Sequence, residues 1–224
     1  MFQNPKKNIL AVLLLFPTIL LAHDVSSGDQ VILNNGGLLS YVWVGAKHML
    51  TGYDHLLFLA GVIFFIDGFK DIIKFITVFT IGHSITLIGG TFLEIQVNEY
   101  LIDAIIALSV LYKGFENLKG FEKIFKIKAP NLLAMVLIFG LIHGLGLSTR
   151  LQSFDMGEEQ ILLKILSFNM GVELGQIAAL VPIIFLISKW KEKSSYKAFY
   201  KASNTYLIIA GIVLFMYQIY LYSK

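Results

Sequence analysis

The sequence contains no cysteine among its 224 residues. This absence excludes a disulfide framework, a thiolate metal site, an iron–sulfur cluster and a cysteine nucleophile. Any metal in this protein must therefore be held by imidazole, carboxylate, amide or backbone oxygen.

Charge is also scarce, because only 15% of the residues are charged, whereas about a quarter are charged in an average soluble domain. Hydrophobic residues make up 56% of the chain. This composition argues against a soluble enzyme and excludes intrinsic disorder, which requires few apolar residues and much charge. The net charge of +3 does not indicate nucleic-acid binding, since the lysines stand in short clusters between apolar runs, as in membrane-protein loops.

The N-terminus has the pattern of a secretory signal peptide. Two lysines precede an apolar run, 9–21, and Ala22 is the small residue expected before a cleavage site. We expect residues 1–22 to be a cleavable signal peptide and residues 23–224 to form one transmembrane domain. The alternative is an uncleaved first helix, for which the run is short. Cleavage would place His23 at the new N-terminus, where its amine and imidazole could chelate a metal.

Six further apolar segments follow, each long enough to cross the roughly 30 Å hydrocarbon core of a bilayer as an α-helix. In lipid every backbone N–H and C=O needs an internal partner, which favours helices. The predicted fold is therefore all-α: a polytopic membrane helix bundle with six transmembrane helices after the signal peptide. The predicted spans are 40–66, 72–94, 98–115, 131–149, 160–188 and 203–222.

Lysines are concentrated in alternate loops. The positive-inside rule assigns such basic loops to the cytoplasm. We therefore expect a multi-pass protein of a bacterial inner membrane, with the mature N-terminus and the C-terminus outside. The lysines that carry this prediction are Lys70, Lys74, Lys113, Lys119, Lys123, Lys126, Lys128, Lys189, Lys191, Lys193, Lys197 and Lys201.

Ionisable side chains inside the predicted spans are the most informative feature of the sequence. Each costs several kcal/mol in lipid unless it is paired or faces a cavity. Four of the five histidines lie in predicted spans. The candidate metal ligands are His48, Asp54, His55, His83, His143 and Glu173.

The first span carries His48, Asp54 and His55. The two histidines are seven residues apart, about two helical turns, so one helix would present both on one face, with Thr51 between them. Imidazole and carboxylate together suit Ni²⁺, Co²⁺, Zn²⁺ or Cu²⁺. The aspartate could instead orient an imidazole from behind, or the set could be polar packing without metal. Gly52 permits a helix break or the close approach of a neighbour.

The remaining candidates lie on three other spans. His83 is in the middle of its span, and His143 follows Gly140 and precedes Gly144, a spacing that allows close helix packing. Either histidine could instead be a hydrogen-bonded core residue. The fifth span carries a polar stripe. Its members are Asn169, Glu173 and Gln176; Glu173 is a candidate ligand or proton carrier, and Asn169, Gln176 and Thr51 are candidate supporting residues.

Three other polar residues stand near the ends of the third span. We expect Asp103 to be exposed at the membrane interface. We expect Glu116 and Asn117 to be solvated or to cap the helix.

Four segments together resemble the HupE/UreJ family of hydrogenase and urease accessory membrane proteins. The resemblance covers nearly all of the chain after the signal, and the combination is specific where any single segment would be weak. The segments are Thr51-Gly52-Tyr53-Asp54-His55-Leu56-Leu57-Phe58 with His48 before it, Gly82-His83-Ser84-Ile85-Thr86-Leu87, Phe139-Gly140-Leu141-Ile142-His143-Gly144-Leu145-Gly146 and Phe168-Asn169-Met170-Gly171-Val172-Glu173-Leu174-Gly175-Gln176.

The resemblance implies secondary permeation of nickel, or sometimes cobalt, into the cytoplasm to supply metalloenzymes. On that analogy His48, Asp54 and His55 recognise the metal. In the hydrogenase-associated branch of the family, the second His-Gly motif is closely followed by a glutamate. No glutamate closely follows His143 here, and Glu173 is the candidate for that role.

We therefore expect a permease that moves nickel or cobalt, with zinc or copper as alternatives, and that holds no tightly bound cofactor. Its expected partners are the lipid bilayer and the metal ion, with no nucleic acid; its oligomeric state stays open. The sequence has no nucleotide-binding loop, so the driving force would be a gradient, the membrane potential or a proton. The alternatives are an intramembrane zinc hydrolase and a metal-binding membrane protein that does not transport.

Overall fold

The computed structural model describes residues 27–65, 68–152 and 159–224. These residues form helices joined by turns and contain no strand, which confirms the all-α prediction for this part of the chain. The predicted signal peptide, its cleavage site and His23 lie outside the described residues and stay predictions.

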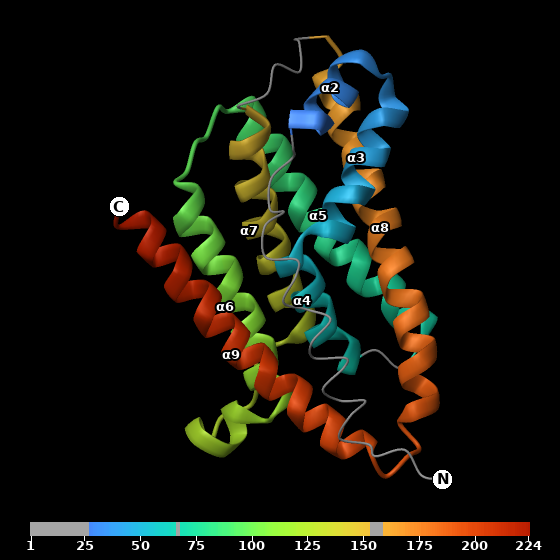
Figure 1. Cartoon of the computed structure of the whole chain (residues 1–224), viewed down its shortest axis with the longest axis vertical. Helices are drawn as coiled ribbons and strands as arrows, with labels where there is room; N and C mark the ends of the chain where they lie inside the picture. Colours follow the sequence, from blue (N-terminus) through green and yellow to red (C-terminus); the bar gives the residue numbers. More distant parts are fainter. Residues whose placement is uncertain (1–26, 66–67, 153–158) are drawn as a thin grey trace.

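The long helices run along one axis of the molecule, as Figure 1 shows. Each predicted span has a helical counterpart, and one helix that was not predicted, α2, precedes them. The elements are α2 (Ser27–Asn35), α3 (Leu38–Thr51), α4 (Tyr53–Val62), the 3₁₀ turn η2 (Ile63–Phe65), α5 (Phe69–Phe92), α6 (Glu99–Asn117), the π-helical turn η3 (Phe121–Phe125), α7 (Leu132–Gln152), α8 (Ile161–Trp190) and α9 (Tyr196–Tyr222).

The first predicted span is not one helix. α3 ends at Thr51 and α4 begins at Tyr53, with Gly52 between them at φ −68° and ψ 108°. Any residue tolerates these angles, so glycine is needed here for space. A Cβ at Gly52 would stand 2.8 Å from Nδ1 of His55 and 3.2 Å from Oδ1 of Asp54. The prediction of one continuous helix over this span is therefore wrong, and the helix break that was the alternative at Gly52 is confirmed.

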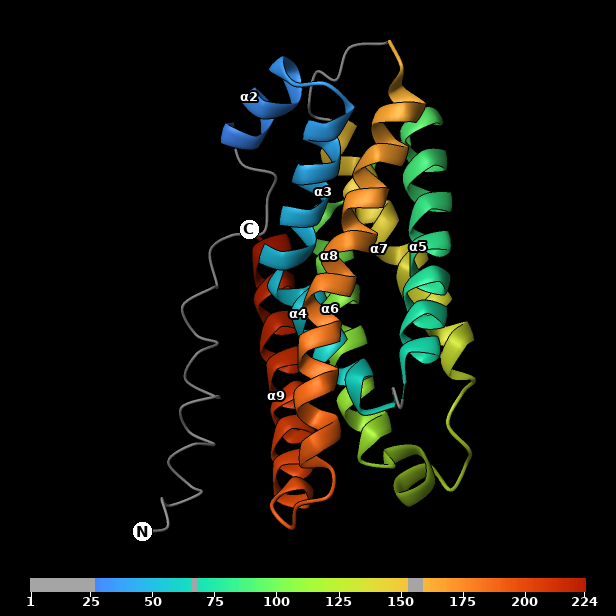
Figure 2. The ribbon, with the colours of Figure 1, turned by 90° about the vertical axis from the view of Figure 1, so that its right-hand side faces the viewer.

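The bundle consists of three closely packed helix pairs. These pairs are α5 with α7, α6 with α9, and α3 with α8. Figure 1 shows α6 and α9 side by side on the left and α3 and α8 on the right, and Figure 2 shows the same bundle from the side. The short helix α4 belongs to none of the pairs and packs mainly on α6.

Glycines allow the paired helices to approach closely. A Cβ at Gly171 of α8 would overlap the carbonyl oxygen of Val42 on α3, and a Cβ at Gly144 of α7 would overlap that of His83 on α5. Gly140 meets the backbone of α5 in the same way. Small residues at helix contacts are typical of membrane bundles, where lipid provides no hydrophobic drive for association. The predicted packing role of Gly140 and Gly144 is confirmed.

Among the described residues, four helices are long and apolar enough to cross a membrane: α5 from Lys70 onward, α7, α8 and α9. α3 and α4 are each too short because of the break at Gly52. α6 has 19 residues, but charged side chains interrupt its apolar sequence. The membrane character of the protein is therefore supported, and the count of six spans stays a prediction.

Apart from the exposed Glu99 at its start, the charged side chains of α6 are buried and paired. Nη2 of Arg150, on α7, donates to Oδ2 of Asp103 at 2.7 Å, and Nζ of Lys113 donates to Oε2 of Glu116 at 2.6 Å. Asp103 is 8% exposed, Glu116 7% and Asn117 3%. The predictions of an exposed Asp103 and of solvated Glu116 and Asn117 are therefore wrong. The side chains of Glu116 and Asn117 do not take the alternative role of capping α6 either, because they bond Lys113 and the carbonyl of Gly61 on α4. A charge of opposite sign within hydrogen-bond distance is what makes such burial tolerable.

Candidate metal site

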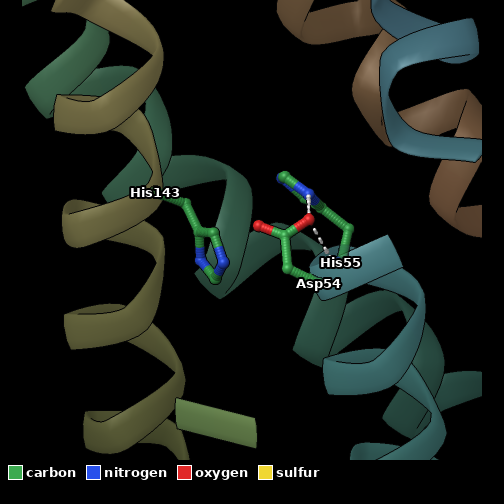
Figure 3. A group of neighbouring side chains, drawn as sticks. All are labelled: Asp54, His55 and His143. Carbon is green, nitrogen blue, oxygen red and sulfur yellow. Dashed lines mark hydrogen bonds and ion pairs between the residues drawn. The ribbon is translucent and has the colours of Figure 1, made fainter. Parts of the chain in front are cut away.

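Three of the predicted ligands meet where α4 begins. Asp54, His55 and His143 each offer one ligand atom, and these atoms lie within 4.8 Å of one another. All three side chains are buried. Figure 3 shows His143 reaching from α7 toward the first turn of α4, which carries the other two. Within the described part of the chain, no other such trio of His, Asp or Glu side chains is found.

The hydrogen bond of His143 fixes which of its nitrogens faces the site. Nδ1 lies 2.9 Å from the carbonyl oxygen of Phe139, one turn earlier on α7. A carbonyl oxygen can only accept, so Nδ1 carries the proton and Nε2 carries the lone pair. Nε2 is buried and has no hydrogen-bond partner. A ring held at one nitrogen with a lone pair on the other is the arrangement of a metal-binding histidine.

Asp54 orients His55, its neighbour in sequence. Oδ1 of Asp54 lies 2.8 Å from both the backbone nitrogen and the ring Nδ1 of His55. The carboxylate accepts from both, which leaves the lone pair of His55 on Nε2. This geometry supports the orienting role considered for Asp54. Its second oxygen, Oδ2, is the atom through which it could also bind a metal directly.

The break at Gly52 adds helix-end electrostatics to the site. The C-terminal end of α3 carries partial negative charge, which favours a cation nearby. Asp54 stands in the first turn of α4, where a carboxylate complements the positive helix end. Discontinuous helices of this kind form ion sites in membrane transporters.

His48 lies at the end of α3, on the other side of the break. Its ring centroid is 5.0 Å from that of His55, and the ring of His55 is 4.8 Å from that of His143. His48 is only partly buried. The three imidazoles therefore form a row across α3, α4 and α7, with His48 at its more exposed end.

His83 is not a member of the trio at α4. Its Nδ1 lies 2.9 Å from Oδ1 of Asn169, a bond that joins α5 to α8. His83 is fully buried, and its Nε2 has no hydrogen-bond partner. Asn169 thus has a supporting position, but it supports His83 and not the trio at α4.

The structure does not bring Glu173 to the trio. Glu173 lines an open groove of about 580 Å³ between α5 and α8, opposite the hydroxyl-bearing residues Thr77, Thr80 and Ser84. The groove is otherwise lined by apolar side chains. Glu173 is therefore a polar group of the α5–α8 groove.

The last two supporting candidates also lie apart from the trio. Thr51 is exposed, and its hydroxyl donates to the carbonyl of Lys47 on its own helix at 2.8 Å. Gln176 is 1% exposed and lines a small apolar cavity together with Phe58 and Phe79.

Sequence reasoning missed an aromatic layer next to the imidazoles. Phe58 contacts Phe79 and Phe139, with ring centroids 5.9 and 5.3 Å apart, and the rings of Phe58 and Phe79 also approach His83 or His143. Each phenylalanine stands three or four residues, about one helical turn, from a histidine of its own helix. That spacing was the available signal, but phenylalanine is too common in this sequence for the spacing to be selective.

The donor set has a definite metal preference. Two imidazoles and a carboxylate suit borderline divalent ions such as Ni²⁺, Co²⁺ and Zn²⁺. Because the protein has no thiolate, the site is poorly suited to soft ions.

Comparison with known families gives one clear result. A family model described as HupE / UreJ protein matches residues 28–224. The searches of curated proteins and of solved structures gave no match.

Proposed function

The chain belongs to the HupE/UreJ family, and from this premise we propose that it is a secondary permease for a divalent transition metal, nickel or cobalt. Family membership supports a nickel or cobalt accessory or transport role, and the finer assignment to a permease is our proposal. In this proposal the metal enters from outside, binds at mid-bundle and leaves toward the basic cytoplasmic loops, where it supplies metalloenzymes of a bacterial cell.

The observation that carries the proposal is the buried trio of Asp54, His55 and His143. A buried carboxylate with two imidazoles lowers the cost of bringing a divalent cation into the membrane. Three protein ligands leave coordination positions open on the ion. The next ligands along the path can bind at these positions before the trio releases the ion. His48 is the candidate first contact, because it is partly exposed and its ring adjoins His55.

The aromatic layer of Phe58, Phe79 and Phe139 lies on one side of the metal site. Along each of their helices, the phenylalanine stands about one turn from the ligand histidine or His83, always on the side away from α2. An ion that leaves the trio toward that side must displace these rings. We assign the layer as the barrier on the cytoplasmic side.

The remaining predicted ligands have secondary roles in this proposal. His83, with its lone pair on a buried nitrogen, is a candidate second contact for the ion. Glu173 is a candidate proton carrier because it faces an open groove.

Uptake into proteoliposomes tests the proposal. The purified protein would be offered Ni²⁺, Co²⁺, Zn²⁺ and Cu²⁺ separately. The expected result is saturable uptake of Ni²⁺ or Co²⁺ that is lost in His55→Ala. The matched control is Ser109→Ala, which removes a buried hydroxyl bonded only to its own helix and should transport normally.

The alternative functions are those of a hydrolase and of a metal-binding protein that does not transport. An open coordination position beside two imidazoles and a carboxylate is also compatible with zinc catalysis. No uptake of any metal, together with one tightly held ion per chain by elemental analysis, would replace the permease proposal with one of these.

A further inference from the structure

The C-terminal end of α4 docks on a polar cluster that the metal site does not use. Nδ2 of Asn117, on α6, donates to the backbone carbonyl of Gly61 at 2.9 Å and also to Oδ1 of Asn204, on α9. Asn204 donates to the carbonyl of Tyr200, whose hydroxyl donates to the carbonyl of Asn117. Asn117 is 3% exposed and Asn204 0%. The cluster therefore joins α4 to the α6–α9 pair.

The contact lies at the end of α4. Gly61 is the next-to-last residue of this helix, which ends at Val62. Carbonyls in the last turn of a helix need partners from outside the regular ladder. Asn117 supplies such a partner from a neighbouring helix and so fixes the end of α4 to α6.

The backbones are also in close contact there. A Cβ at Gly61 would stand 2.8 Å from Cβ of Lys113 on α6 and 3.3 Å from Cδ1 of Leu207 on α9. Lys113 is fully buried and paired with Glu116, so it has little freedom to move aside. α4 thus packs against both α6 and α9.

α4 is bounded by a break at one end and a turn at the other. The break at Gly52 separates it from α3, and the turn η2 follows its other end. Its aromatic contacts with α5 and α7 are apolar and non-directional, whereas a hydrogen bond has a fixed distance and angle. The bond from Asn117 is therefore a directional contact between α4 and α6 that limits how far α4 can shift along the bundle axis.

We propose that Asn117 is a positioning residue for the metal site. It holds one end of a ten-residue helix, about 15 Å long, whose other end carries Asp54 and His55. Asn117 thereby sets where these two ligands stand relative to His143 on the α5–α7 pair. The inference rests on the proposed function, because the group that Asn117 positions is the proposed metal-binding set.

Cobalt binding to the purified full chain tests this role. Asn117→Leu removes the amide, and Gly61→Ala pushes the two helices apart without touching the amide. Both should weaken Co²⁺ binding about tenfold, as is typical when a residue that orients metal ligands is lost. Both should also change the visible ligand-field spectrum of the bound Co²⁺. Tyr200→Phe, which removes a different bond of the same cluster, should leave both unchanged.

The spectrum separates positioning from simple destabilisation. A merely structural lesion would lower the melting temperature but leave the spectrum of cobalt bound to the folded protein as in the wild type. Wild-type affinity and spectrum in a folded Asn117→Leu protein would overturn the inference. If Asn117→Leu does not fold, Gly61→Ala decides by the same two readouts.

Failure of the proposed function would look different. If the wild-type protein binds no Co²⁺ or Ni²⁺, the metal proposal fails, and amide hydrogen exchange of residues 53–62 then decides the positioning role. Faster exchange of the first turn of α4 in Asn117→Leu, but not in Tyr200→Phe, would support it. Unchanged exchange in that turn would overturn it.

Discussion

The imidazole rings of His48 and His55 lie 5.0 Å apart at an interplanar angle of 75°, although the helix between them is broken at Gly52. In a continuous helix their backbones would stand about 10 Å apart along the axis. The break instead lets two helix ends face one another and places the His55 ring beside both the His48 ring and the carboxylate of Asp54. The local chain geometry, more than helix periodicity, creates the site.

Gly52→Ala should therefore damage the site. The added Cβ would stand 2.8 Å from Nδ1 of His55 and 3.0 Å from the carbonyl oxygen of His48, so the His55 ring must rotate away from Asp54. We expect Ni²⁺ affinity, measured by isothermal titration calorimetry, to fall about tenfold or more. Gly37→Ala, where a Cβ meets nothing within 4 Å, is the control. Equal affinities of the two variants would show that space at Gly52 does not shape the site.

His143→Ala should remove the ligand that α7 contributes to the site. The substitution removes the buried Nε2 lone pair that faces Asp54 and His55. We expect at least about a tenfold loss of Ni²⁺ affinity and loss of saturable uptake, with an unchanged elution volume in detergent. Ser109→Ala serves again as the control. Metal binding at wild-type strength in folded His143→Ala would remove this histidine from the site.

Asp54→Asn separates charge from shape at the same position. The amide oxygen can still accept the hydrogen bonds from His55, but the negative charge that compensates a buried divalent cation is gone. The variant should keep its melting temperature and lose metal affinity and uptake. If both binding and uptake are unchanged in proteoliposomes, the trio is not the metal site.

Arg150→Met tests the stability contributed by buried charge pairing. The substitution deprives Asp103 of the guanidinium 2.7 Å away while its carboxylate stays buried. Breaking such a pair costs about 3–5 kcal/mol, which should appear as a lower melting temperature in detergent. The double variant Arg150→Met with Asp103→Leu should recover much of the loss. An Arg150→Met protein as stable as the wild type would show that the pair contributes little.

The length of the apolar runs and the residue types predicted most of the fold. Apolar runs of about 20 residues predict helices because lipid leaves the backbone few alternatives, and the six predicted segments all contain helix. The short helix α2 was missed because it has no long apolar run; Asp29 of α2 is instead bonded to Lys47 of α3 at 2.7 Å. Capping and pairing interactions of this kind depend on residues distant in sequence.

The choice among candidate ligands was only partly predictable. His48, Asp54 and His55 are close in sequence, so their proximity follows from local geometry. His143 joins them only through the packing of the bundle, in which glycines bring α7 against α5. His83 and Glu173 carry the same residue types but face Asn169 and the α5–α8 groove. Residue type alone does not distinguish these cases, since side-chain direction depends on how helices are rotated about their axes.

By itself the sequence determined the helical, membrane-type fold, the absence of thiol chemistry, the family and the set of residues able to bind a metal. These properties depend on composition and local spacing. The tertiary structure alone decided which of those residues meet, that Asn117 bonds the end of α4, and that Asp103 of α6 is paired with Arg150 of α7 inside the bundle. The reason is physical: such contacts join residues up to 89 positions apart, His55 and Asp54 with His143, and only close helix packing brings them together.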